Sequence, residues 1–144
     1  MKLLRTIIIV TMLFGILGLS VKADTSFKSK TVYANAKKTY SAITDSKNKK
    51  IYKNKAWYVT AKKITYSPKD SFVGYGMCFS PMIKNAGTYA LAGGSRQWIK
   101  KGSDSPVYGE WNGKGKCGYY YLGVRLDTDF TGKYGTVKGL WNAR

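Results

Sequence analysis

Histidine is missing from this chain, which leaves few residues able to carry out acid–base or nucleophilic chemistry. Ser-His-Asp and Cys-His nucleophile systems, histidine-ligated zinc and histidine-based ribonuclease chemistry all require an imidazole. These classes of enzyme are therefore excluded. No cofactor and no metal is expected, and the sequence predicts a protein that is not an enzyme.

Paired carboxylates are the remaining route to catalysis. Glu110 is the single glutamate, it stands beside Trp111, and Asp127 and Asp129 are the nearest candidates for its partner. A glycan hydrolase needs two carboxylates on either side of the bond that it cleaves. Asp127 and Asp129 lie in a polar segment where aspartate is common for local hydrogen bonding. A carboxylate-based hydrolase is therefore kept only as the weakest alternative.

Basic and aromatic side chains alternate in two segments. The first contains Arg96, Trp98, Lys100 and Lys101, and the second contains Tyr121 and Arg125. Aromatic rings stack on sugars or bases, and neighbouring cations bind phosphate. These residues are the candidates for a binding surface, although most aromatic residues of so small a chain must fill its core.

Lysines crowd the segment from residue 45 to residue 55. The five are Lys47, Lys49, Lys50, Lys53 and Lys55. Such a run is typical of a solvated loop between strands. It is also a candidate polybasic surface, worth about 1 kcal/mol per basic residue near an anionic membrane, and one loop can serve as both.

The first 23 residues have the three parts of a secretory signal peptide. Lys2 and Arg5 supply positive charge, residues 7–19 form an apolar stretch, and small residues precede Asp24. The apolar stretch is shorter than the roughly 20 residues that span a bilayer. We therefore expect cleavage between Ala23 and Asp24 and secretion of the remaining chain, with an uncleaved membrane anchor as the alternative.

An exported chain with two cysteines favours a disulfide. Cys78 and Cys117 are the only pair, and bonds of this kind form in oxidising compartments. The sequence therefore predicts a Cys78–Cys117 bridge.

The rest of the chain reads as short strands separated by Gly, Asn, Asp, Ser and Pro. Residues 24–50 are predicted to be a polar, lysine-rich, loosely ordered start with one edge strand near residues 31–34, and residues 51–144 a β-rich domain. In residues 119–126, Tyr120, Leu122, Val124 and Leu126 are expected to face the core. Further strands are predicted at residues 56–66, 72–79, 88–92, 96–100, 107–111 and 134–141. About seven short strands indicate an all-β fold, a small antiparallel β-sandwich or barrel.

The C-terminal half shows a resemblance to known proteins. Residues 121–127, a polar turn and residues 134–142, which end in Gly-Leu-Trp-Asn, resemble the closing hairpin of small uncharacterised secreted β-sandwich proteins of Gram-positive bacteria. Residues 56–61 resemble the early tryptophan-containing strand of these proteins. A fainter resemblance is to the lactococcin-type bacteriocins, which are small, basic β-sandwiches. The resemblance implies export and a β-sandwich, and it supplies no catalytic residue.

Charge indicates the kind of partner. Cleavage after Ala23 removes three of the 25 basic residues and none of the 7 acidic ones, so the formal net charge falls only from +18 to +15. A field of this sign favours anionic partners. We expect a secreted, cationic binding or effector protein that acts on an anionic cell-wall polymer or membrane surface, an antimicrobial action being one form of this. A protein partner is the alternative, and nucleic acid would bind only through charge.

Overall fold

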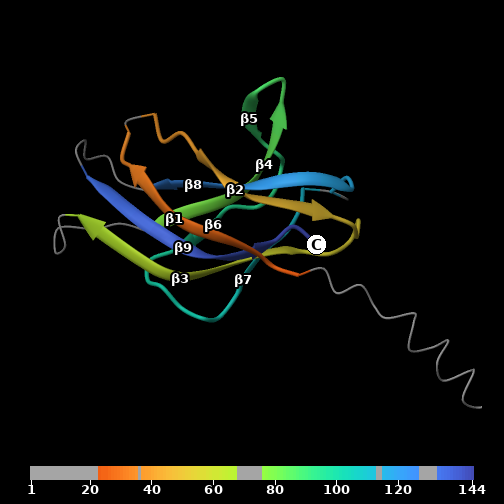
Figure 1. Ribbon diagram of the computed structural model, residues 1–144. Coiled ribbons are helices and arrows are strands. Elements are labelled where there is room, and N and C mark those ends of the chain that lie inside the picture. The colour runs from red at the N-terminus through yellow and green to blue at the C-terminus, as the bar shows by residue number, and fades with distance from the viewer. Residues whose placement is uncertain (1–22, 36, 68–75, 113–114, 127–132) are drawn as a thin grey trace, which may run out of the picture.

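Nine β-strands make up the regular structure of the residues that the computed structural model describes, which are 23–35, 37–67, 76–112, 115–126 and 133–144 (Figure 1). The strands are β1 (Thr25–Tyr33), β2 (Ser41–Lys50), β3 (Trp57–Ser67), β4 (Met77–Asn85), β5 (Thr88–Leu91), β6 (Gln97–Ile99), β7 (Val107–Gly109), β8 (Gly118–Leu126) and β9 (Tyr134–Asn142). No helix long and apolar enough to cross a membrane occurs in these ranges.

The strands form two antiparallel sheets that face each other (Figure 1). Sheet A has the order β1-β9-β3-β7, and sheet B has the order β2-β8-β4-β5, with β6 also paired to β4. The prediction of a small all-β antiparallel fold is confirmed, with nine strands in place of about seven.

Large apolar side chains from both sheets fill the space between them. Trp57 and Trp141 come from sheet A, and Phe79, Leu122 and Val124 come from sheet B, all with no exposed surface. Period-two alternation in β8 turns Tyr120, Leu122, Val124 and Leu126 inward as predicted. Gly109 leaves room for the Trp57 indole, because a side chain at position 109 would overlap that ring.

Residues 25–50 are not a loosely ordered start. β1 is the edge strand of sheet A beside β9, and β2 is the edge strand of sheet B beside β8. The Lys28 amide donates a hydrogen bond to the Asp45 carboxylate at 2.9 Å, which ties β1 to β2. The polar residues of this segment lie on exposed faces, or are buried with hydrogen-bond partners, as for Ser46 and Asn48.

Two β-bulges flank β9 in sheet A. Residues 28 and 29 of β1 together oppose Lys138, and residues 61 and 62 of β3 together oppose Gly139. One extra residue moves all later side chains to the other face of the strand. Val59 and the first bulge residue, Ala61, therefore face the core, whereas after the bulge Ile64 packs against the core and Lys63 is exposed.

β4 continues through Pro81 to Asn85, whereas the strand predicted from the sequence ended at residue 79. The Pro81 carbonyl accepts a hydrogen bond from the Ala92 amide at 2.9 Å. The backbone nitrogen and carbonyl of Pro81 therefore point away from β8, toward the gap between β6 and β5. The missing N–H of proline therefore costs no hydrogen bond to β8. Of the predicted strand at residues 72–79, residues 72–75 lie outside the described residues.

The predicted Cys78–Cys117 disulfide is wrong: both thiols are free, Cys78 buried and Cys117 exposed. Cys78 pairs with Arg125 of β8, and Cys117 precedes the other end of that strand. The eight residues from 117 to 125 span roughly 27 Å at ~3.4 Å per residue. A disulfide requires Cα atoms within about 7 Å.

Candidate binding surface

The outer face of sheet B carries the basic-aromatic pairs of this protein. Alternation along β8 that buries Leu122 and Val124 turns Tyr119, Tyr121 and Arg125 outward. Gly123 shares this face, and Met82 of β4 packs over it because position 123 has no side chain. We define the outer basic-aromatic surface as Tyr40, Lys47, Lys49, Lys84, Tyr89, Trp98, Tyr119, Tyr121 and Arg125.

Arg125 lies between two aromatic rings. Its guanidinium carbon is 5.2 Å from the Tyr40 ring centroid and 5.2 Å from that of Trp98. Its Nη1 donates to the Lys38 carbonyl at 3.0 Å, while its buried Nε has no partner among the described residues. The two segments singled out in the sequence, around Trp98 and around Arg125, therefore meet, because β6 and β8 both pair with β4.

Cys78 lies beneath this stack. Its Sγ and the Tyr40 hydroxyl are 2.9 Å apart and share a hydrogen bond. Burial raises the pKa of the Cys78 thiol, an effect that Tyr40 and Arg125 oppose. Burial also raises the pKa of Tyr40 above its ordinary range. With both pKa values raised, the thiol and the phenol are neutral at physiological pH, and their hydrogen bond joins β4 to the residue before β2.

Two lysines of the neighbouring strand β2 make cation–π contacts with the Tyr119 ring. The ammonium nitrogens of Lys47 and Lys49 lie 4.5 Å and 5.9 Å from its ring centroid. Lys49 pairs directly with Tyr119 across β2 and β8, and the tyrosine is 57% exposed. Ring and ammonium groups here remain accessible to a ligand.

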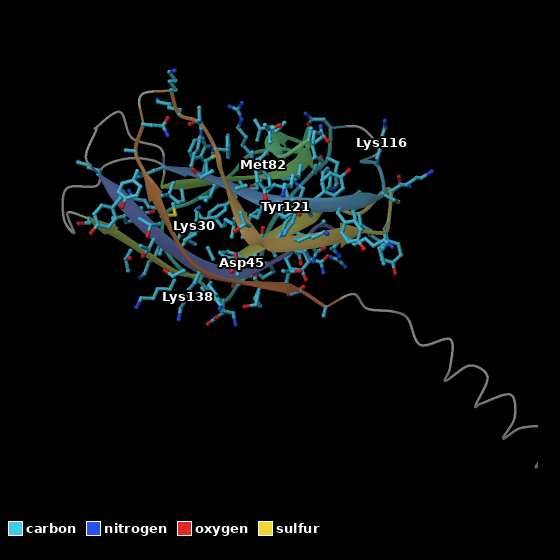
Figure 2. All side chains as sticks on the ribbon, turned by 45° about the horizontal axis from the view of Figure 1, so that its top comes forward. Lys30, Asp45, Met82, Lys116, Tyr121 and Lys138 are labelled. Carbon is cyan, nitrogen blue, oxygen red and sulfur yellow. The ribbon has the colours of Figure 1, made fainter. Side chains whose placement is uncertain are left out.

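Tyr121 and Tyr89 form a third group. Their rings meet edge to face with centroids 5.1 Å apart, and the Lys84 ammonium lies 5.6 Å from the Tyr89 ring. Lys84 and Tyr89 are opposite each other in the β4–β5 hairpin, which turns through Ala86 and Gly87, both with positive φ. Figure 2 shows that Tyr121 and Met82 lie on one side of the molecule and Lys138 on the other.

Lys50 does not belong to this surface, contrary to the sequence-based interpretation of a polybasic segment. It is fully buried, and its amine donates to the carbonyl oxygens of Lys55 at 3.1 Å and Arg144 at 2.7 Å. The same amine lies 4.8 Å from the Trp111 ring centroid. A lysine in this position anchors the last residues of the described chain and is unavailable to a ligand.

The other predicted basic residues are dispersed. Lys53 and Lys55 lie in the turn after β2 and line a hollow of about 230 Å³ with Glu110 and Trp111. Arg96 is exposed just before β6, and its charge acts to lower the pKa of both Tyr40 and Cys78, so it lies beside the outer basic-aromatic surface. Lys100 and Lys101 follow β6, where the Lys100 carbonyl accepts a hydrogen bond from Tyr66 of sheet A. Of the predicted set, Lys47, Lys49, Trp98, Tyr121 and Arg125 therefore lie on this surface, with Arg96 beside it.

Lys84, Tyr89, Tyr40 and Tyr119 were not among the predicted site residues. The signal for Lys84 and Tyr89 was the Asn-Ala-Gly sequence at residues 85–87, which favours a tight hairpin and places them opposite each other. Tyr40 and Tyr119 join the surface through pairing of β2 with β8, which the sequence does not specify.

The carboxylates assemble no metal site in the described part of the chain, where no group of three or more His, Cys, Asp or Glu residues comes together. Glu110 is exposed, and its backbone amide donates to the Ser95 hydroxyl at 2.8 Å. Asp127 and Asp129, its predicted partners, lie outside the described residues.

Comparison of the chain with protein-family models, curated proteins and solved structures finds no match.

Proposed function

We propose that this protein is a secreted, cationic, non-enzymatic binding protein that uses the outer basic-aromatic surface to bind an anionic polymer or membrane at the cell envelope. The observation that carries the proposal is the repeated placement of a cation beside an exposed ring on one sheet face, as at Lys47 and Tyr119. Rings of this kind stack on the apolar faces of sugars, and the cations neutralise phosphate or carboxylate groups. An antimicrobial action, as in the lactococcin-type bacteriocins that the sequence resembles, is one form that this binding would take.

Export through a signal peptide cleaved after Ala23 is part of the proposal. Cleavage there leaves Asp24, whose carboxylate accepts hydrogen bonds from the Tyr58 hydroxyl and from the Asn142 amide, the latter at 3.1 Å. Because β1 begins at Thr25, the processed chain keeps every strand of sheet A. The cleavage site is tested by mass spectrometry of the exported protein.

Binding is tested with purified cell walls and with vesicles of anionic or neutral lipid, at low and high salt. We expect binding to the walls or to the anionic vesicles that weakens as salt screens the charges. Tyr119→Ser combined with Lys49→Gln removes one ring and one cation and should weaken binding about 10-fold or more, since base or sugar stacking on a ring is worth ~1–3 kcal/mol.

Tyr108→Ser combined with Lys62→Gln is the matched control, because it also removes one ring and one positive charge, from residues that line one hollow on sheet A. Tyr108 is 53% exposed, close to the 57% of Tyr119, but it lies on β7 of sheet A. Equal loss of binding in both variants would assign the interaction to overall charge instead of to this surface. No binding to walls or to any vesicle at low salt would reject the proposed function.

A protein partner is the second candidate, and one feature favours it. β5 and β6 are short strands that leave the outer edge of sheet B interrupted, and β5 has four residues. An extended peptide could add a strand there. Such a complex would survive high salt, unlike binding to an anionic polymer.

A further inference from the structure

The outer face of sheet A carries a second group of polar side chains, separate from the outer basic-aromatic surface. Ser29, Lys63, Thr65, Thr136 and Lys138 line a shallow hollow of about 250 Å³. They come from three adjacent strands, β1, β9 and β3. Figure 2 shows Lys138 on the side of the molecule away from Met82 of sheet B.

Two lysines face each other across this hollow. Lys63 and Lys138 are direct cross-strand partners in the pairing of β3 with β9. Residues paired in this way have Cβ atoms roughly 5 Å apart, and like charges in such a pair repel each other. Both side chains are exposed, and neither ammonium group has a hydrogen-bond, ion-pair or ring partner within the ranges that the structure describes. The pair is therefore unfavourable for the chain alone.

Hydroxyl groups complete the hollow. Thr65 and Thr136 are also direct partners, two positions further along the same face, and their hydroxyls hydrogen-bond to each other. That bond uses one of the two hydroxyl protons, so one threonine proton and the Ser29 proton are left to donate. Together with the two ammonium groups, these hydroxyls form a set of hydrogen-bond donors around one space. None of the side chains that line this space is negatively charged.

The two β-bulges explain why these residues meet. The β3 bulge at residues 61 and 62 turns Lys63 outward, although the alternation set by Val59 and Ala61 would have turned it to the core. The β1 bulge contains Ser29 and lies opposite Lys138. Two bulges on either side of one strand, both at the same level, re-aim side chains toward one place, as bulges beside functional sites do.

We infer that this hollow binds a phosphate group. Lysine binds phosphate as a point charge, whereas a planar carboxylate is matched better by the fork of arginine. Two positive charges suit a phosphate carrying about −1.5 to −2 charges. Its tetrahedral oxygens can accept from both lysines and from the hydroxyls together. The bound anion would also remove the repulsion between Lys63 and Lys138.

Inorganic phosphate is the first probe, measured by calorimetric titration of the full chain against chloride at equal ionic strength. Lys63→Gln or Lys138→Gln should weaken phosphate binding about 10- to 100-fold, because each removes a charged donor worth ~1.5–3 kcal/mol. The same variants should melt in chloride at the same temperature as wild type or higher, since the like-charge repulsion is gone. Lys62→Gln, an exposed lysine on the same strand that lines a different hollow, is the control and should bind phosphate as wild type does.

A second probe separates the sources of the phosphate group. Vesicles containing phosphatidic acid present it as a lipid headgroup. Vesicle binding that Lys63→Gln weakens and Lys62→Gln leaves unchanged would assign a membrane source to this hollow. Vesicle binding that is equal in wild type, Lys63→Gln and Lys62→Gln, together with inorganic phosphate binding that only Lys63→Gln weakens, would assign a soluble source. Phosphate binding that is absent, or that is lost equally in Lys62→Gln and Lys63→Gln, would overturn the inference. Because this hollow is on the opposite sheet from Tyr119, either result leaves the test of the proposed function independent.

Discussion

Replacing Lys50 by methionine or by alanine separates the contribution of its amine from that of its carbon chain. The side chain has no exposed surface and donates to the carbonyls of Lys55 and Arg144. Methionine keeps a buried chain of similar length, whereas alanine removes it. Truncating a buried side chain of this size to alanine costs about 2–5 kcal/mol. We therefore expect the free energy of unfolding of Lys50→Ala to be about 2–5 kcal/mol lower than that of Lys50→Met.

The buried amine of Lys50 should make the free energy of unfolding depend on pH. Burial lowers the pKa of Lys50, and the thiol of Cys117 opposes this shift more weakly. In the unfolded chain a lysine titrates near ~10.4, so between the folded and the unfolded pKa the unfolded chain binds more protons. Burial of the charged amine therefore lowers the free energy of unfolding at pH values below the folded pKa. This loss becomes smaller as pH rises from the folded pKa toward about 10.4.

Urea unfolding at a series of pH values between neutral and about 10.4 measures this effect. The unfolding free energy of wild type minus that of Lys50→Met should rise with pH, with a slope of at most ~1.4 kcal/mol per pH unit for one proton. Subtraction cancels the buried tyrosines, which both proteins share. A difference that does not change with pH, together with equal stability of the methionine and alanine variants, would refute the buried position of this amine.

Three further predictions follow from other residues. Gly139→Ala should lower the unfolding free energy by about 1–3 kcal/mol in urea, because the new Cβ would overlap the Thr60 carbonyl oxygen; an unchanged midpoint would contradict the β3 bulge. In the native protein one thiol, that of Cys117, should react with a thiol reagent, and Cys78 should react only after unfolding. If neither thiol reacted even in the unfolded protein, the sequence-based prediction of a disulfide would be correct after all. Burial raises the pKa of Tyr58 and Tyr66 from 10.0 to about 12, so in ultraviolet titration they should ionise after the exposed tyrosines. Since the unfolded chain loses these protons first, stability should fall as pH rises from about 10 toward 12.

Strands whose apolar residues alternate without interruption could be predicted from the sequence, whereas only the end of β1, in the edge strand predicted near residues 31–34, was predicted, and β2 was not predicted. β8 alternates without interruption, so Leu122 and Val124 identify its buried face. In β1 the core residues are Phe27 and Val32, an odd number of positions apart, because the bulge at residues 28 and 29 shifts the alternation. A period-two pattern cannot detect the full length of such a strand.

β2 was missed for a different reason. Its inner face is polar, since Ser46, Asn48 and Lys50 are buried there beside Ile43. Each polar group is satisfied by a partner far away in the sequence, as when Ser46 accepts a hydrogen bond from the Leu122 amide at 2.8 Å. Sequence reasoning has no access to such partners, and it therefore assigned these residues to solvent.

The binding surface was predicted only in parts. Residue types indicated Trp98 and Arg125 separately, but their contact depends on β4 standing between β6 and β8. The hollow around Lys63 could not be predicted at all, because it depends on two bulges and on the order β1-β9-β3.

The order of the strands also determines when the protein can fold during its synthesis. β1 is hydrogen-bonded to β9 in sheet A, and β2 is hydrogen-bonded to β8 in sheet B. The first two strands therefore cannot pair until the last two have been synthesised. Until residues 118–142 emerge from the ribosome, the backbone groups of β1 and β2 have no ladder partner. Pairing of such distant segments is slow, since a long loop must close before any contact forms. A chain that cannot close its sheets until late remains unfolded for longer, which is the state that the export we propose would require.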